Sequence, residues 1–194
     1  MNDKQRKYLN IVREQLTHLT GLVEQILTLS VENRSTFRLT PEPVRMAELL
    51  PTLIEQHKLK TSKPLTIKTE VPDCMIISAD RTHLYNMVSN LIENAIKYSG
   101  EKPCQMQVKA VQVQEEIRLS VTDNGIGISE ANQKHLFDKF FRVPSGNLHN
   151  VKGYGLGLYY VSNLMARHNG YVTVKSQLGK GSTFTLHFKI QHDE

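Results

Sequence analysis

Two asparagines placed four residues apart are the first side chains in this sequence whose type and spacing suit a ligand. Asn90 and Asn94 lie in residues 80–98, a stretch with helical apolar periodicity, and residues four apart on a helix project from one face. Amide oxygens are hard ligands that Mg²⁺ accepts, and Mg²⁺ usually shares its coordination with phosphate and water. Most such pairs are structural, so this one indicates a magnesium and phosphate site only together with other segments.

A carboxylate followed by two glycines is the second candidate. Residues 123–128 read DNGIGI and come directly after an expected strand. Asp123 could accept a hydrogen bond from the exocyclic amine of adenine, while Gly125 and Gly127 would let the backbone pass close to the base. A hairpin turn is the competing interpretation, because Asn-Gly is its commonest signal. Taken alone, the segment favours neither interpretation.

Two further glycine segments lie nearer the C-terminus. Residues 153–158, GYGLGL, open an expected helix, and the free amides of a helix N-terminus bind phosphate. Their spacing is GxGxG and the strand expected directly before them is missing, which disfavours a dinucleotide-binding fold. Residues 179–184, GKGSTF, form a turn into the last expected strand, where a hydroxyl could support the site. Alone, this segment is an ordinary turn.

The elements that must position these segments follow from the apolar periodicity. Helices are expected at 47–58, 80–98 and 158–168, and strands at 65–71, 75–78, 105–114, 117–122, 171–176 and 183–190. Asp80 is the expected N-cap of the second helix. The buried side of that helix is expected to consist of Leu84, Met87, Val88, Leu91, Ile92 and Ala95. Because there is no regular strand-helix-strand repeat, the pattern favours an α+β sandwich.

The N-terminal segment has a different pattern. Apolar residues recur at alternating spacings of three and four from Leu9 to Ile26, which predicts a long helix that packs in a bundle or dimer. Pro41 and Pro43 then interrupt the periodicity. We therefore expect a helix over residues 1–34, a linker over 35–45 and a domain over 46–194.

Composition disfavours several classes of protein. With 194 residues and 39% hydrophobic content the chain can bury a core, and its apolar runs fall far short of the roughly 20 residues that cross a bilayer. The N-terminus lacks the continuous apolar stretch of a signal peptide, so a cytoplasmic location is expected. Cys74 and Cys104 have neither metal-ligand nor disulfide spacing. The net charge of +5 is spread along the chain, which disfavours nucleic-acid binding.

In order and separation, the four segments resemble the N, G1, G2 and G3 boxes of the histidine kinase branch of the GHKL ATPases. Residues 137–142, FDKFFR, resemble the F box of that branch, and the N-terminal helix with residues 39–44 resembles the second helix of its dimerisation and phosphoacceptor domain. The resemblance implies the Bergerat fold: a two-layer α/β sandwich, with a mixed sheet packed on helices, preceded by a long helix. It also implies transfer of the γ-phosphoryl group of ATP to a histidine, for later relay to a response-regulator aspartate.

The resemblance implies roles at the phosphate end of the nucleotide. Asn94 would coordinate Mg²⁺, Asn90 and Lys97 would contact the phosphates or the metal, and Arg142 would reach the terminal phosphate. Asn90, Lys97 and Arg142 are therefore the expected catalytic residues. Residues 144–152 would form a mobile lid over ATP. The backbone amides that hold phosphate oxygens would be those of Gly155, Leu156 and Gly157.

Roles at the base end are implied in the same way. Asp123 would accept from the adenine amine, Tyr98 would lie against the nucleotide, and Thr183 would support Asp123 through a water or a hydrogen bond. The base pocket would be shaped by Gly125, Gly127 and Ile128.

A phosphoacceptor histidine is not evident. In the family it is followed at once by Glu or Asp and then by a proline, whereas His18, the only histidine in the expected N-terminal helix, is followed by Leu19 and Thr20. Our hypothesis is that the chain starts after the acceptor helix, binds ATP and does not phosphorylate itself. The implied partners are an acceptor helix of the same or a partner subunit, a response regulator, and a second copy in the intact, membrane-anchored homodimer.

Three other functions compete with this one. Hydrolysing GHKL ATPases of the gyrase, chaperone and mismatch-repair kind carry a Glu at the position of Asn90, and an amide cannot abstract a proton from water; Glu93 lies on a different helical face. An anti-sigma-factor serine kinase is disfavoured by the dimerisation-type helix. A non-catalytic docking module with a decayed site remains an alternative, which the intact boxes disfavour.

Overall fold

The computed structural model describes residues 38–143 and 154–190. The chain divides into two compact units, Met1–Arg38 and Leu39–Glu194. The helix expected over residues 1–34 and the lid expected over residues 144–152 lie outside the described residues. Within the described ranges, no helix is both long and apolar enough to cross a membrane.

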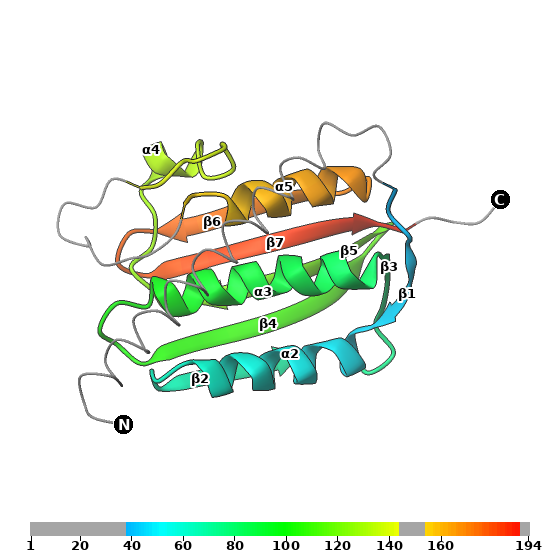
Figure 1. The fold of residues 1–194 in the computed structure, drawn as a ribbon, viewed down its shortest axis with the longest axis horizontal. Coiled ribbons are helices and arrows are strands. Elements are labelled where there is room, and N and C mark those ends of the chain that lie inside the picture. Colours follow the sequence, from blue (N-terminus) through cyan, green and yellow to red (C-terminus); the bar gives the residue numbers. More distant parts are fainter. Residues whose placement is uncertain (1–37, 144–153, 191–194) are drawn as a thin grey trace, which may run out of the picture. The chain divides into compact units, whose positions relative to one another are not determined.

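A mixed sheet forms one layer of the second unit (Figure 1). In the described residues its strand order is β2-β4-β5-β7-β6. The strands are β2 (Leu65–Glu70), β4 (Cys104–Val113), β5 (Glu116–Asp123), β7 (Gly181–Lys189) and β6 (Tyr171–Gln177). The pairing of β2 with β4 is parallel, and the other three pairings are antiparallel. A separate two-stranded antiparallel sheet pairs β1 (Glu42–Arg45) with β3 (Ile76–Ala79).

Helices form the second layer and cover one face of the sheet (Figure 1). They are α2 (Met46–Lys60), α3 (Arg81–Lys97) and α5 (Gly157–Arg167), with a short α4 (Glu130–Gln133) between β5 and α5. This arrangement confirms the expected α+β sandwich with a mixed sheet packed on helices.

The central helix α3 forms as its sequence predicts. The side chain of Asp80 caps it by accepting a hydrogen bond from the backbone N–H of His83 (3.1 Å). Its buried residues are those expected from the periodicity, Leu84, Met87, Val88, Leu91, Ile92 and Ala95. They meet the alternating buried side chains of β4, whose Met106 and Val108 point toward the helices. The hydrophobic core therefore lies between α3 and the sheet.

Part of the expected linker over residues 35–45 is a strand. Residues 42–45 form β1, in which Val44 is fully buried, and the backbone N–H of Met46 donates to the carbonyl of Met75 (3.0 Å). Proline lacks a backbone N–H and is found in sheets on edge strands, so Pro43 is compatible with this strand. Pro41 and Pro43 had indicated only that the helical periodicity ends there, which is why β1 was not expected.

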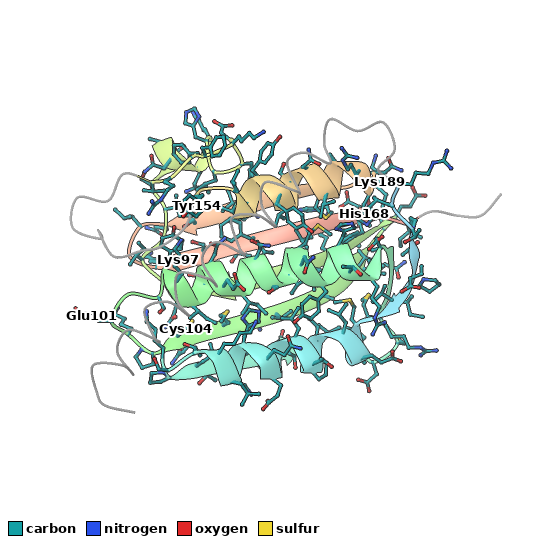
Figure 2. The ribbon with its side chains drawn as sticks, in the orientation of Figure 1. Lys97, Glu101, Cys104, Tyr154, His168 and Lys189 are labelled. Carbon is teal, nitrogen blue, oxygen red and sulfur yellow. The ribbon has the colours of Figure 1, made fainter. Side chains whose placement is uncertain are left out.

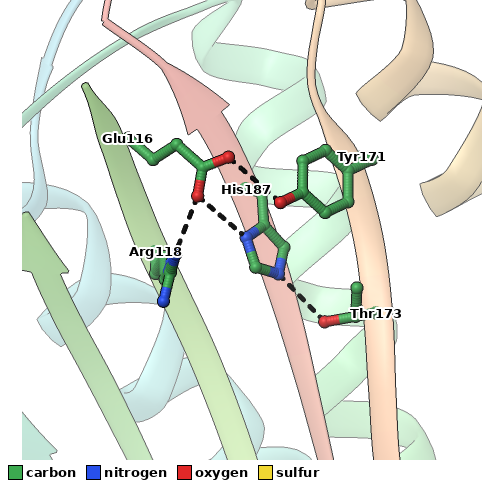
Figure 3. Close-up of polar contacts among 5 residues, drawn as sticks. All are labelled: Glu116, Arg118, Tyr171, Thr173 and His187. Carbon is green, nitrogen blue, oxygen red and sulfur yellow. Dashed lines mark hydrogen bonds and ion pairs between the residues drawn. The ribbon is translucent and has the colours of Figure 1, made fainter. Parts of the chain in front are cut away.

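The face of the sheet opposite the helices carries a polar cluster that joins β5, β6 and β7 (Figure 3). The phenol of Tyr171 donates to Glu116 (3.0 Å), and the ring of Tyr171 stacks on His187 with centroids 4.2 Å apart. His187 also lies 2.9 Å from the hydroxyl of Thr173. The hydrogen bond from Tyr171, together with those from Arg118 and His187, holds the pKa of Glu116 below its usual value despite partial burial. We name these five residues the open-face cluster.

Candidate functional site

The N-terminus of α5 lies against the middle of α3. Asn90 donates through Nδ2 to the backbone carbonyl of Asn86 (2.9 Å), which leaves its Oδ1 directed at the start of α5. A Cβ atom added to Gly157, the first residue of α5, would lie only 2.6 Å from that oxygen. Two segments that are 67 positions apart in the sequence therefore meet at an amide oxygen and a helix N-terminus, where an anion and a hard cation can both be held.

Gly155 lies against the segment that resembles the F box. Its φ angle is +75°, and a Cβ there would be 2.6 Å from the carbonyl oxygen of Phe141. Leu156, between the two glycines, is buried. The backbone before α5 is thus held between Asn90 and the residues that lead to Arg142.

Two cationic side chains, Lys97 and Arg142, lie at the same end of α3. Lys97 is half-buried; burial lowers the pKa of its ammonium group, the nearby charge of Arg142 lowers it further, and Glu93 opposes the shift. The Lys97 ammonium lies 5.1 Å from the centre of the Tyr98 ring. Figure 2 shows Lys97 and Tyr154, which precedes α5, at the same end of the molecule. Neighbouring cations that disfavour each other are stabilised by an anion, so this end of the site suits phosphate.

Asp123 ends β5 as a half-buried carboxylate. Its Oδ1 accepts a hydrogen bond from the backbone N–H of Gly125 (2.8 Å). Burial raises the pKa of Asp123, and hydrogen bonds from the backbone of Gly125 and Ser182 partly offset that rise. A carboxylate has room for about four hydrogen bonds, so Asp123 retains acceptor capacity for a donor such as an amino group on a planar base.

The loop after Asp123 is attached on both sides. The backbone N–H of Ile126 donates to the carbonyl of Tyr98 (3.0 Å), at the end of α3, and Gly179 donates to the carbonyl of Ile126 (2.7 Å). Ile128 donates to the hydroxyl of Ser176 on β6 (2.8 Å). The chain then continues into α4 and not into a strand that pairs back on β5, so the hairpin interpretation of Asn-Gly was wrong.

The structure does not bring the side chain of Thr183 to Asp123. Asp123 is paired with Ser182, and Thr183 is paired with Thr122; the two threonine hydroxyls lie 3.0 Å apart. Successive side chains of a strand point to opposite faces, so Thr183 lies on the face away from α3. A direct hydrogen bond from its side chain is thereby excluded. Ser182 is buried on the face of Asp123; its backbone donates a hydrogen bond to the carboxylate, and its hydroxyl lies 3.0 Å from that of Ser176.

The remaining expected residues lie around these two ends. Asn94 is half-buried one turn beyond Asn90, and Tyr98 is half-buried at the C-cap of α3, where burial raises the pKa of its phenol and Arg142 opposes the rise. Asn90, Lys97, Arg142 and the start of α5 thus form a cationic end. Asp123, its glycine loop and Tyr98 form a second end that is suited to a flat polar ring.

Gly127 and Gly179 provide a matched test of this backbone. Both have positive φ, but a Cβ on Gly127 would lie 2.0 Å from the carbonyl oxygen of Gln177, whereas Gly179 has nothing within 4 Å. Gly179→Ala should cost only the left-handed strain, about 1–2 kcal/mol. Gly127→Ala should cost about 2–5 kcal/mol, because backbone must also move. Urea unfolding measures the free energy of unfolding of both variants. Equal losses of stability would contradict the close backbone contact between Gly127 and Gln177.

Comparison with known proteins supplies the family. Residues 79–192 match the model described as histidine kinase-, DNA gyrase B-, and HSP90-like ATPase. The sensor protein RprX of Bacteroides fragilis (strain YCH46) is 34% identical over 180 residues, covering 91% of this chain and 34% of that protein. The sensor protein kinase WalK of Staphylococcus saprophyticus is 30% identical over 182 residues, covering 93% and 30%. This chain spans about a third of the length of these curated relatives.

A solved structure has the same fold. The crystal structure of full-length ShkA in complex with AMPPNP has a TM-score of 0.80 and 27% identity, over 100% of this chain and 41% of that chain. The family model covers more than half of the present sequence and includes every residue discussed for both ends of the site. The chain therefore belongs to the histidine kinase-, DNA gyrase B- and HSP90-like ATPase family.

Proposed function

We propose that this chain is the ATP-binding catalytic part of a sensor histidine kinase. In this proposal it transfers the γ-phosphoryl group of ATP to a histidine on a phosphoacceptor helix, for relay to a response regulator. The names of RprX, a sensor protein, and WalK, a sensor protein kinase, support the proposal. The two ends of the site support it as well, since one suits phosphates and the other suits adenine.

Phosphoryl transfer depends mainly on positioning and charge stabilisation. Lys97 and Arg142 would neutralise the phosphates, and the backbone amides of Gly155, Leu156 and Gly157 would orient them. Mg²⁺, when bound, would neutralise charge on the phosphate oxygens. The amide oxygens of Asn90 and Asn94 fit such a hard cation, with Asn94 as the proposed direct ligand. At the other end, Asp123 would accept from the adenine amine, and Ser182 and a water reached from Thr183 are candidates to support it.

The amide at residue 90 is the observation that carries the choice of kinase over hydrolase. Its nitrogen is occupied by the carbonyl of Asn86, and its oxygen faces α5 at the phosphate end. An amide cannot act as a general base toward water. Glu93 is exposed and lies 3.5 Å from the hydroxyl of Ser89, on another side of α3. We therefore propose slow background hydrolysis of ATP and transfer when an acceptor is supplied.

The proposal extends to partners and location. The acceptor helix would belong to the same or a partner subunit of a homodimer, and a response regulator would receive the phosphoryl group. The catalytic part would work in the cytoplasm, as part of a protein anchored in the inner membrane. No role in nucleic-acid binding is proposed.

Transfer in trans tests the proposed reaction. Incubation of this chain with γ-labelled ATP, Mg²⁺ and a separate protein that carries a phosphoacceptor hairpin should place acid-labile label on the added protein alone. Lys97→Met should reduce the rate at least about tenfold through loss of one charged contact. Lys102→Met, at an exposed position after α3, should retain it. Rapid phosphate release without an acceptor would favour a hydrolase. Label on this chain itself, if it is lost in His18→Ala, would contradict the hypothesis that the chain does not phosphorylate itself.

The pH dependence of adenosine binding tests the role of Asp123. Adenosine carries no phosphate, so its affinity reports the base end. Because burial raises the pKa of Asp123, affinity should fall on acidification at a higher pH than an ordinary aspartate would give. Asp123→Asn should weaken binding at least about tenfold at pH 7 and leave it nearly independent of pH in calorimetric titrations.

Asp123→Asn should stabilise the fold although it weakens adenosine binding. A carboxyl whose folded pKa is raised destabilises the fold above that pKa, and the penalty disappears as pH falls through it. The Tm of Asp123→Asn should therefore exceed the wild-type Tm at pH 7, and the two Tm values should converge in acid. Unchanged adenosine affinity in this variant would rule out Asp123 as the adenine acceptor.

A further inference from the structure

The interface between α3 and α5 contains polar contacts beyond those of the nucleotide site. The two helices lie side by side (Figure 1) and antiparallel, since Gly157 is close to Asn90 while His168 is close to Asp80. Between these two points lie His83, Asn86 and Tyr160. We name the set the polar seam; its members are Asp80, His83, Asn86, Tyr160 and His168.

Tyr160 is at the centre of the polar seam. Its hydroxyl lies 3.1 Å from Nδ1 of His83 and also takes part in a hydrogen bond with the side chain of Asn86. The phenol is half-buried, and burial is the main cause of its raised pKa. It therefore remains a neutral hydroxyl that can donate one hydrogen bond and accept others.

Tyr160 is also connected to both parts of the phosphate end, the start of α5 and Asn90 on α3. Its backbone N–H donates to the carbonyl of Leu156 (2.8 Å), so Tyr160 lies one helical turn after the glycine segment at residues 155–157. On the other helix, the backbone carbonyl of Asn86 accepts the hydrogen bond that orients Asn90. A movement at Tyr160 would thus change the position of the α5 amides relative to the Asn90 oxygen.

The far end of the polar seam fixes α5 a second time. The backbone N–H of Asp80 donates to Nε2 of His168 (3.1 Å), and Nδ1 of His168 lies 2.8 Å from the carbonyl of Leu164. The first contact needs a lone pair on Nε2 and the second a proton on Nδ1, so the ring is the neutral Nδ1–H tautomer. Figure 2 shows His168 at the end of the molecule opposite Lys97. With contacts at both ends and in the middle, α5 can neither slide nor roll freely on α3.

We propose that Tyr160 is a positioning residue for the phosphates of the nucleotide. This inference rests on the proposed function and adds the device that sets the distance between the phosphate-binding amides of α5 and the asparagines of α3. The base end does not depend on the polar seam, because its loop is attached to Tyr98, to β6 and to the turn between β6 and β7. Loss of the Tyr160 hydroxyl should therefore weaken the binding of phosphates and leave the binding of adenosine unchanged.

Tyr160→Phe tests this with a matched control, Tyr171→Phe. Each variant removes one hydroxyl and one or more hydrogen bonds, but Tyr171 belongs to the open-face cluster on the other side of the sheet (Figure 3). Dissociation constants for Mg-ATP and for adenosine are measured by calorimetry and NMR titration for wild type and both variants. Tyr160→Phe should raise the Mg-ATP constant about 3- to 10-fold, the effect of one hydrogen bond, with adenosine within about twofold. Tyr171→Phe should change neither constant.

The outcomes separate the inference from the function on which it rests. If wild type binds neither ligand, the proposed function fails and the inference with it. If wild type binds both and Tyr160→Phe matches Tyr171→Phe, the function stands and the inference is overturned. If Tyr160→Phe weakens Mg-ATP and adenosine equally, Tyr160 has only a general structural role, which also overturns the inference.

Discussion

The close approach of α5 to α3 at Gly157 is the contact on which the site depends. A Cβ at this position would lie 2.6 Å from Oδ1 of Asn90, so a larger residue would displace the Asn90 amide from its place at the start of α5. The other residues of the phosphate end lie around this approach. Lys97 lies two turns further along α3, and Gly155 is held against the residues that lead to Arg142.

The base end is built differently, from backbone contacts of the sheet. Asp123 ends β5 next to Ser182, and the glycine loop is held between Tyr98, the C-cap of α3, and the turn between β6 and β7. A half-buried carboxylate with a raised pKa costs stability, and such costs are typical of functional sites. The two ends share α3, whose apolar side packs in the core while its other side carries polar residues of the site.

Much of this arrangement could be predicted from the sequence because local pattern determined it. The periodicity of residues 80–98 identified every buried residue of α3, and Asp80 was recognisable as a cap from its type and place. The direct hydrogen bond from Thr183 to Asp123 was wrong because the choice between adjacent hydroxyls depends on strand register, which only the pairing of β5 with β7 defines; support through a water stays a prediction. Knowing that Asp123 and Ser182 share a face would have corrected it.

Other features were missed because they depend on residues far apart in the chain. The polar seam joins His83 to Tyr160, and neither residue has a local pattern that predicts the contact. β1 was taken as linker because its partner, β3, is more than 30 positions away. These are contacts of the tertiary fold, in which helix packing and sheet pairing override local preference.

In the proposed complex, one nucleotide occupies both ends of the site at once. Amide chemical-shift mapping of the ¹⁵N-labelled chain during titration with Mg-ATP tests it most directly. If one nucleotide spans both ends, the largest changes should occur together in the side-chain amides of Asn90 and Asn94, the loop at 123–128 and the backbone at 155–157. Changes confined to the strands around His187, or none at millimolar Mg-ATP, would contradict it.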